Sequence, residues 1–477
     1  MQEMLHLFNS LTKTVEPFRP LKGRTVRMYT CGPTVYDFAH IGNLRTYLFE
    51  DVLKRVFRCD GYRVRHVMNI TDVGHLTDDA DQGEDKLERA ATKQRKSARQ
   101  LAALYTRAFL RDLTRLHVLP ADDLPRATQY IREQIALVRR LDRRGYAYEI
   151  SDGVYFNTAK FSSYGRAFDG QALMEKEAGA RVEVRTEKRS PHDFALWKRT
   201  PPGVQRQMEW DSPWGRGFPG WHLECSTMAR ALLGQPFDVH CGGIDHIPVH
   251  HTNEIAQSEA AYGKSLASVW CHGAFLTVEG KRMGKSEGNL VTIDECMRRG
   301  FDPVSFRYLN LGAHYRSSLN FTWESLAGAQ SALEHLRDRC RALPRLSMTR
   351  DESVEGQMAI NHIRDAFDDD LDTPKAIAIL WEALKPSRPA VLTPDALSTI
   401  IAYADQVLGL GLTAYLGKKV RVPAEVQRLV AAREGARVAK DWARADVLRA
   451  QIEALGWSVE DTKEGPAAKR LITSHVS

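Results

Sequence analysis

Two short segments far apart in the chain carry residues able to bind the phosphates of a nucleotide. The first, YTCGPTVYDFAHIGN at residues 29–43, turns at Gly-Pro and opens a helix at His40-Ile41-Gly42-Asn43. Amide groups and the dipole at a helix start attract phosphate. The second, GKRMGKSEGN at residues 280–289, is a glycine-rich loop that can bring a cation and backbone donors against a polyphosphate. Together they predict the two halves of one ATP site.

The second segment does not fit the P-loop pattern G-x-x-x-x-G-K-[ST]. Counting back from Gly284, the first required glycine is replaced by Glu279, and Gly280 stands one residue too close. A lysine in a glycine-rich loop is by itself more often a solvated turn. Only the coupling to the first segment favours a nucleotide site.

A strand and a helix must position the first segment. Thr25 to Tyr29 reads as an apolar strand, and Arg63 to Ile70 reads as another. Between them apolar residues recur at helical spacing, at Leu44, Tyr47, Leu48, Val52 and Val56. This order predicts a βαβ unit of a Rossmann-type sheet.

The two segments resemble the "HIGH" and "KMSKS" signatures of class I aminoacyl-tRNA synthetases. Further stretches resemble the cysteinyl-tRNA synthetase family, in that family's order and over nearly the whole chain: MYTCGPTVYDFAHIGN, GWHLECS, HHTNEIAQSEA, HYRSSLNF, FDDDLDTPKA and ARVAKDWARAD. The resemblance implies an enzyme that activates L-cysteine with Mg²⁺-bound ATP and transfers the cysteinyl group to tRNA(Cys).

The resemblance also implies which residues act. Such chemistry needs positioning and charge stabilisation more than a covalent nucleophile. The catalytic residues implied are His40, Asn43 and Lys285, and the ATP-binding residues are His40, Gly42, Asn43, Arg282, Met283, Gly284, Lys285 and Ser286. The amino-acid pocket would contain Cys31, Thr71, Trp221 and Asp245. Taken alone, a Trp is usually a core residue and an Asp after Gly-Gly is usually a turn residue.

A thiol substrate raises a problem of selection that a metal can solve. A pocket that separates cysteine from serine or alanine by the shape of one small group gives only roughly 10- to 200-fold discrimination. Zinc favours the thiolate and holds it at about 2.3 Å. By resemblance, one Zn²⁺ per chain is assigned to Cys31, Cys225, His250 and Glu254.

Each of these assignments has a plainer alternative. A His/Glu pair four residues apart on a helix, such as His250 and Glu254, is more often a surface contact, and a lone cysteine is more often a small buried apolar residue. Cys241 and His251 are competing ligands that rank lower. His251 would point about 100° away from His250 on the same helix, and Cys241 falls where the family pattern has glycine.

The chain departs from the family pattern at several positions. Asn43 stands where the usual signature ends in histidine, so it cannot become cationic. Arg282 replaces the usual first lysine and keeps the charge, whereas Gly284 replaces a serine and loses a hydroxyl donor. The run Ile244 to Val249 replaces a more usual Ser-Asp-Leu-Met-Phe-Pro, which predicts a different pocket wall.

Composition agrees with a soluble cytoplasmic enzyme, and we expect it to be a monomer. Of 477 residues, 43% are hydrophobic and 27% charged, and no apolar run reaches membrane length. Seven cysteines at irregular spacing indicate reduced thiols rather than a disulfide framework. A net charge of +7 favours a polyanionic partner only where it clusters.

The predicted fold is an α/β Rossmann-type nucleotide-binding catalytic domain split by an insertion, followed by a helical bundle and a small C-terminal anticodon-binding domain. The expected domains are a first catalytic half at 1–118, an inserted connective domain at 119–190, a second catalytic half at 191–275, a connecting region at 276–321, a bundle at 322–411 and the anticodon module at 423–477. By resemblance, the module would read unpaired anticodon bases with Arg437, Trp442, Asp446 and Asp461.

Two other functions stay open at this stage. A cysteine ligase acting on an amino sugar would use the same catalytic core, but it would not need an anticodon module. A non-catalytic tRNA-binding regulator is suggested by Asn43 and Gly284, whereas His40, Lys285 and the four metal-ligand candidates argue against it.

Overall fold

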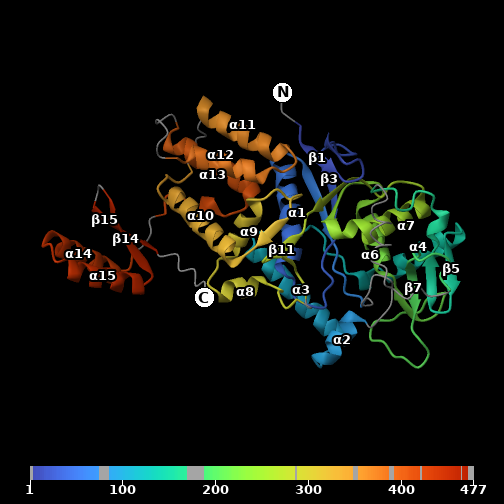
Figure 1. Ribbon diagram of the computed structural model, residues 1–477. Helices are drawn as coiled ribbons and strands as arrows, with labels where there is room; N and C mark the ends of the chain where they lie inside the picture. Colours follow the sequence, from blue (N-terminus) through green and yellow to red (C-terminus); the bar gives the residue numbers. More distant parts are fainter. Residues whose placement is uncertain are drawn as a thin grey trace.

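The central element of the computed structural model is a four-stranded parallel sheet with strand order β10-β9-β3-β4. Figure 1 shows β3 of this sheet beside α1. The structure describes residues 4–74, 85–168, 187–284, 287–346, 353–385, 392–418, 422–462 and 465–470. The sheet consists of β3 (Thr25–Thr30), β4 (Arg63–Met68), β9 (Phe237–Gly243) and β10 (Ala267–Gly273). Helix α1 (Ile41–Cys59) joins β3 to the parallel β4, which confirms the predicted βαβ unit and the α/β fold.

Strand β3 lies between β4 and β9, so the chain order of the sheet reverses there. In open parallel sheets, ligands bind at the carboxyl ends of the strands at such a point. Side chains of β3 alternate between the two faces. Met28 packs in a core shared with α1 and the helical bundle, whereas Tyr29 and Cys31 pack in the core beside α6 (Trp221–Leu233).

The inserted segment forms an antiparallel sheet of its own with order β5-β6-β7-β8. Its strands are β5 (Ala147–Ile150), β6 (Gly153–Phe156), β7 (Ala195–Arg199) and β8 (Gly217–Pro219), and α4 (Ile131–Arg143) packs beside it. The expected domain end at residue 190 is therefore placed too early, because β7 and β8 pair with strands that precede it. The expected start at 119 is also early, since Asp123 and Arg126 still bridge to the end of β4 and to Ile70.

Smaller elements surround this core. The N-terminal hairpin of β1 (His6–Asn9) and β2 (Thr14–Pro17) packs beside β10. Helices α2 (Lys86–Lys93) and α3 (Ala98–Arg115) follow β4, and α7 (Thr252–Tyr262) lies between β9 and β10 in the chain. A three-stranded sheet of β11 (Leu276–Val278), β12 (Lys281–Arg282) and β13 (Leu319–Phe321) carries the second phosphate-site segment. In the chain, α8 (Ile293–Arg298) and α9 (Pro303–Leu311) follow β12 and precede β13.

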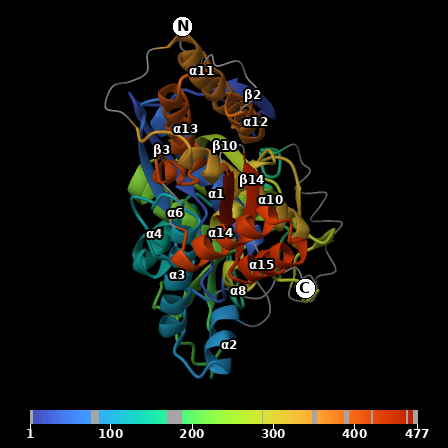
Figure 2. The same ribbon diagram turned by 90° about the vertical axis from the view of Figure 1, so that its left-hand side faces the viewer.

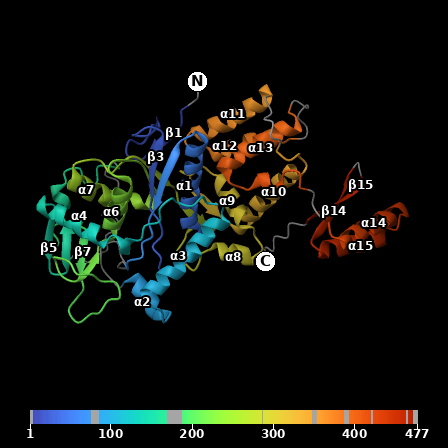
Figure 3. The ribbon, with the colours of Figure 1, turned by 180° about the vertical axis from the view of Figure 1, so that it is seen from behind.

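The C-terminal half is helical up to a separate small module. Helices α10 (Trp323–Arg341), α11 (Val354–Asp368), α12 (Thr373–Ala383) and α13 (Pro394–Leu408) form the bundle over α1. The module of α14 (Ala424–Val438), α15 (Trp442–Ala454), β14 (Trp457–Thr462) and β15 (Gly465–Arg470) stands apart from the body, as two opposite views show (Figures 1 and 3). Figure 2 shows it from the side on which it projects. Among the described residues, no helix has the length and hydropathy that a bilayer crossing needs.

A buried arginine ties α1 to the rest of the molecule. Arg307 on α9 places Nη2 2.6 Å from Oδ2 of Asp51 on α1, and both side chains are fully inaccessible to solvent. The same guanidinium donates to the carbonyls of Leu116 at 3.0 Å and Leu408 at 2.5 Å. One side chain therefore joins α1 and α9 to the chain segments that follow α3 and end α13.

Replacing this arginine should be strongly destabilising. Arg307→Met leaves Asp51 buried with a single remaining arginine partner, and breaking a buried pair costs about 3–5 kcal/mol. Arg298→Met is the matched control, since its pair with Glu295 is 72% exposed on the arginine side and should contribute less than about 1 kcal/mol. Urea unfolding of both variants measures the difference. Equal free energies of unfolding for the two variants would contradict this role of Arg307.

Candidate active site

A cavity of about 750 Å³ opens at the carboxyl ends of β3 and β9. His40, Gly42 and Asn43 of the first segment line it, and so do Arg282 and Met283 of the second. The Met283 methyl group lies so close to Gly42 that a Cβ there would come within 3.3 Å of it. The two segments predicted to form one site therefore meet in one cavity.

The second segment is only partly described. The backbone N–H of Gly284 donates to Asn289 Oδ1 at 3.0 Å, and Asn289 Nδ2 donates to the Arg282 carbonyl at 3.1 Å, so Asn289 shapes the loop. Gly284 itself is not among the residues that line the cavity. Lys285 and Ser286 lie outside the described residues.

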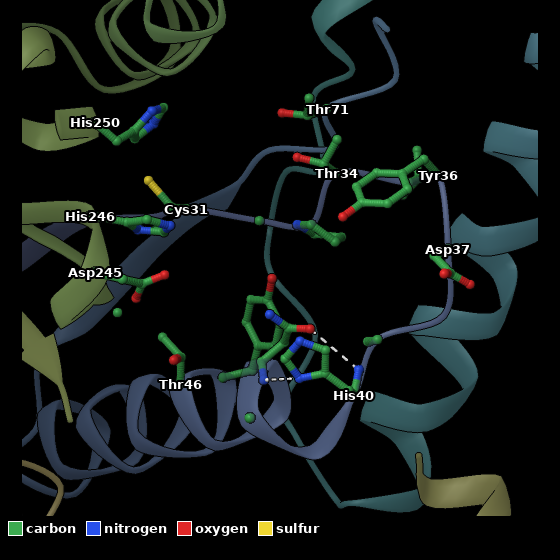
Figure 4. Close-up of a pocket in the computed structure, with 18 of the residues that line it drawn as sticks. Cys31, Thr34, Tyr36, Asp37, His40, Thr46, Thr71, Asp245, His246 and His250 are labelled. Carbon is green, nitrogen blue, oxygen red and sulfur yellow. Dashed lines mark hydrogen bonds between the residues drawn. The ribbon is translucent and has the colours of Figure 1, made fainter. Parts of the chain in front are cut away.

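His40 and Asn43 hold each other at the start of α1. The Asn43 backbone N–H donates to His40 Nδ1, and the His40 backbone N–H donates to Asn43 Oδ1, both at 3.3 Å (Figure 4). This is a reciprocal capping box, which satisfies two backbone donors at a helix start. Because Nδ1 accepts, the neutral His40 ring carries its proton on Nε2. Asn43 thus fixes the tautomer of the neighbouring histidine.

The residues expected to bind the amino acid, Cys31, Thr71, Trp221 and Asp245, also line the cavity. Figure 4 shows Cys31, Thr71 and Asp245 away from His40. Thr71 Oγ1 donates to Glu224 Oε2 at 2.9 Å, and this hydrogen bond fixes the orientation of the Thr71 side chain. The Trp221 ring packs against the His250 ring, with centroids 4.5 Å apart. Asp245 is exposed and folds over Gly243, where a Cβ would meet its Oδ1 at 2.2 Å.

Cys31, Cys225, His250 and Glu254 converge in one cluster. Their ligand atoms all lie within 4.8 Å of one another, and all four residues are buried. His250 Nε2 is 3.1 Å and Cys31 Sγ is 3.9 Å from Glu254 Oε1. Tetrahedral zinc with S, N and O ligands needs separations of roughly 3.3–3.8 Å. The donor set and its spacing therefore fit a zinc ion, and the other ring nitrogen of His250 faces His222 Nδ1 at 3.1 Å.

The charges of this cluster are strongly perturbed. Burial raises the pKa of Cys31 well above its ordinary value, whereas the hydrogen bond from Cys31 lowers the pKa of Cys225. Burial acts to lower the pKa of His250, but the Glu254 and Cys225 charges raise it to about 10. Burial opposes ionisation of Glu254, yet His240 and His250 lower its pKa to about 2. A divalent cation would replace the protons of His250 and Cys31, as metal binding does at such sites.

A second set of potential ligands overlaps the first. Cys31 and Glu254 also converge with His240 and His251. His251 Nε2 lies 3.3 Å from Cys31 Sγ, so the expected 100° separation does not remove His251 from the cluster. The reason is local, because His250 and His251 both lie in a π-helical turn, Ile247–His251, that precedes α7. Cys241 instead packs in the core on the α1 face of the sheet and belongs to neither ligand set.

Sequence reasoning missed His240 and His272. They lie in β9 and β10, and both are buried against Trp270. Histidine inside the apolar runs FDVHCGG and SVWCHG was the available signal, since a buried polar side chain needs a hydrogen-bonding partner. Which partner it meets depends on contacts far apart in the chain.

In the C-terminal module, two of the expected residues form an ion pair with each other and the other two are exposed. Asp461 forms ion pairs with Arg437 at 2.5 Å and with Arg433 at 3.1 Å. Trp442 opens α15 and is 60% exposed, and Asp446, one turn later, is also exposed. The module has its own core of Val426, Val430, Ile452 and Trp457.

Comparisons with known proteins agree with this arrangement. Residues 17–331 match the family described as tRNA synthetases class I (C) catalytic domain, and residues 420–465 match the cysteinyl-tRNA ligase anticodon binding domain. A methionyl-tRNA synthetase of Mycobacterium tuberculosis, solved with methionyl-adenylate, superimposes with a TM-score of 0.57 at 15% identity, over 82% of this chain and 93% of that one. The parallel sheet, its insertion and the two-part cavity are thus those of a class I aminoacyl-tRNA synthetase.

Two relatives show which family of class I aminoacyl-tRNA synthetases the chain resembles. Cysteine–tRNA ligase 1 of Burkholderia lata is 50% identical, with 97% of this chain and 96% of that protein covered. The cysteine–tRNA ligase of Treponema denticola is 39% identical, with 98% and 100% covered. The chain belongs to the cysteine–tRNA ligase family.

Two substitutions of Asn43 separate helix capping from phosphate binding. Asn43→Ala removes one half of the capping box and should cost about 1 kcal/mol of stability. Asn43→Asp keeps the acceptor oxygen and adds a charge that favours a helix start but repels phosphate. We expect near-normal thermal stability and weaker ATP binding for Asn43→Asp, measured by calorimetric titration. If ATP binds Asn43→Asp as tightly as the unaltered protein, Asn43 does not face the phosphates.

Proposed function

We propose that this enzyme activates L-cysteine with ATP to form cysteinyl-adenylate and pyrophosphate, and then transfers the cysteinyl group to tRNA(Cys). The observation that carries the proposal is a single cavity with a helix start suited to phosphate at one end and a thiolate-rich ligand set at the other. A cysteine spanning the two ends brings its carboxylate towards the α-phosphorus of ATP.

We assign one zinc ion to Cys31, Cys225, His250 and Glu254. When bound, zinc supplies selection of the substrate as its thiolate over the hydroxyl of serine. Cys31, Cys225 and His250 line the cavity and so face the substrate, whereas Glu254 is fully buried and is held from behind by His240 Nε2 at 3.2 Å. Asp245 pairs with the substrate ammonium, and Trp221 and Thr71 close the pocket around it.

At the ATP end, positioned charge performs the chemistry. His40 presents its Nε2–H to the phosphates, Asn43 holds that tautomer, and Arg282 adds a cation beside Mg²⁺-bound ATP. Gly42 and Met283 pack closely, and this contact restricts where the phosphates can lie. We assign Lys285 to the transition state, with Gly284 and Ser286 in the same loop. Fixed donors of this kind stabilise charge that develops on the transferring phosphorus centre.

The C-terminal module supports tRNA as the acceptor. Trp442 offers an exposed ring on which an unpaired base can stack, and Asp446 lies one turn further on the same helix. Arg437 and Asp461, paired in the free protein, supply polar groups for base edges. An amino-sugar ligase would need none of these residues. The proposed enzyme acts as a cytoplasmic monomer.

The test is cysteine-dependent ATP–pyrophosphate exchange, run beside charging of tRNA with a GCA anticodon and with serine as the control amino acid. We expect both activities with cysteine and neither with serine. Exchange without charging would favour the amino-sugar ligase, and loss of both in zinc-loaded protein would favour a binding-only regulator. Trp442→Ala should lower charging by roughly 5- to 150-fold, from a stacking energy of about 1–3 kcal/mol, and leave exchange intact.

The metal assignment is tested by Cys225→Ser. Losing a ligand should lower bound zinc and cysteine activation together, by more than the roughly 10- to 100-fold typical of losing a partner behind a ligand. Cys296→Ser is the matched control, because Cys296 is equally buried but lies in a different core cluster. Zinc is counted by elemental analysis. Full zinc content in Cys225→Ser would transfer the assignment to the set with His240 and His251.

A further inference from the structure

A line of three hydrogen bonds leads from the N-terminal hairpin to the sulfur of Cys31. Ser10 Oγ lies 2.7 Å from His272 Nδ1, and His272 Nε2 lies 2.7 Å from His251 Nδ1. The line ends where His251 Nε2 lies 3.3 Å from Cys31 Sγ. Its four members are Ser10 just after β1, His272 in β10, His251 in the turn before α7 and Cys31 just after β3.

All four members of the line are buried. Ser10 is 7% exposed, His272 5%, Cys31 5% and His251 0%. The Phe168 ring meets His272 edge-on at 5.7 Å, and the Trp270 ring lies 5.0 Å from His251. Aromatic neighbours on both imidazoles restrict their rotation. The Ser10 backbone N–H also donates to the Trp270 carbonyl at 2.8 Å, which fixes the hydroxyl beside His272.

Each link can hold one proton, so the line has a direction. Two ring nitrogens 2.7 Å apart share a single hydrogen, and each neutral imidazole donates at one nitrogen and accepts at the other. If His251 donates to Cys31, then His272 must donate to His251, and the Ser10 hydroxyl must donate to His272. The reverse direction would leave the lone pair of His251 facing the sulfur.

We propose that Ser10 and His272 are positioning residues that hold the Nε2–H of His251 on the sulfur of Cys31, and so tune this thiolate as a metal ligand. The inference rests on the proposed zinc assignment and deepens it. A thiolate that accepts a hydrogen bond donates less charge to its metal, which leaves the metal more electrophilic towards the substrate sulfur. Residues behind a ligand orient and tune it in this way.

The charge of the site favours this direction over the reverse. Cys31, Cys225 and Glu254 would place three negative charges around one divalent ion, and a donor aimed at Cys31 offsets part of the excess. The reverse direction suits a metal bound by His251 itself, within the overlapping set that includes His240. The two directions therefore predict different ligands for one metal.

The test uses the full-length protein loaded with Co²⁺, whose thiolate charge-transfer band reports the electron density on the cysteine sulfurs. In Ser10→Ala we expect the band to move to longer wavelength and the Co²⁺ affinity to fall about 10-fold. Ser10→Thr, which keeps the hydroxyl, should restore both. Thr14→Ala is the matched control, because it removes an exposed hydroxyl of the same hairpin.

A double substitution separates tuning from support of the hairpin. His251→Gln retains an amide donor for Cys31 that does not depend on the proton of His272. In this background, Ser10→Ala should no longer shift the band, whereas a purely structural Ser10 would weaken metal binding in both backgrounds. An unchanged band and affinity in folded Ser10→Ala overturn the inference.

The same spectra distinguish failure of the inference from failure of the zinc assignment. Absence of Co²⁺ uptake by the unaltered protein, or a full thiolate band in Cys225→Ser, overturns the metal assignment itself. Loss of the metal in His251→Gln together with its retention in Cys225→Ser shows the reverse direction, with His251 as a ligand.

Discussion

The alternation of side chains along β3 is the constraint on which the site depends. Met28 of β3 packs in the core beneath α1, whereas Tyr29 and Cys31, the residue after the strand, pack towards α6. The strand therefore delivers a sulfur to one face and, ten residues later, starts a helix whose first amides face the same cavity. A shift of one residue in this strand would exchange the faces and remove the thiolate from its partners. This strand therefore sets the distance between the two ends of the cavity.

Several buried polar groups around the sheet are arranged in pairs and chains. Arg307 and Asp51 share one contact beneath α1, and His222, His240, His251 and His272 surround the cysteine and glutamate ligands. Burying such groups is costly unless each finds a partner. Burial lowers the pKa of His251 and His272, so these two rings are neutral and leave an imbalance between the negative groups Cys225 and Glu254 and the cation His250. This imbalance is what a divalent ion would balance.

Local features of the fold and site could be read from the sequence. The βαβ unit, the helix start at His40 and the approach of His250 to Glu254 follow from short-range periodicity and capping, and the two phosphate-site segments were paired by resemblance. The pairing of β7 and β8 with β5 and β6 could not be read, because it depends on register across a long intervening segment. The approach of His251 to Cys31 could not be read, because a π-helical turn stands where the sequence predicted an α-helix. The partnership of Ser10 with His272 joins residues 262 positions apart, and no local pattern encodes it.

The N-terminal hairpin also has a consequence for synthesis of the chain. Ser10 contacts β10, Phe8 N–H donates to Asp370 Oδ1 at 2.8 Å, and the Asp370 N–H donates to the His6 carbonyl at 3.1 Å. The hairpin thus leaves the ribosome before its partners, which emerge more than 250 and 350 residues later. Until then, the cysteines of the nascent chain lack their native enclosure. Completion of the catalytic centre is therefore a late event of translation, and a fragment truncated before the bundle would lack the contacts that Asp370 makes with the hairpin.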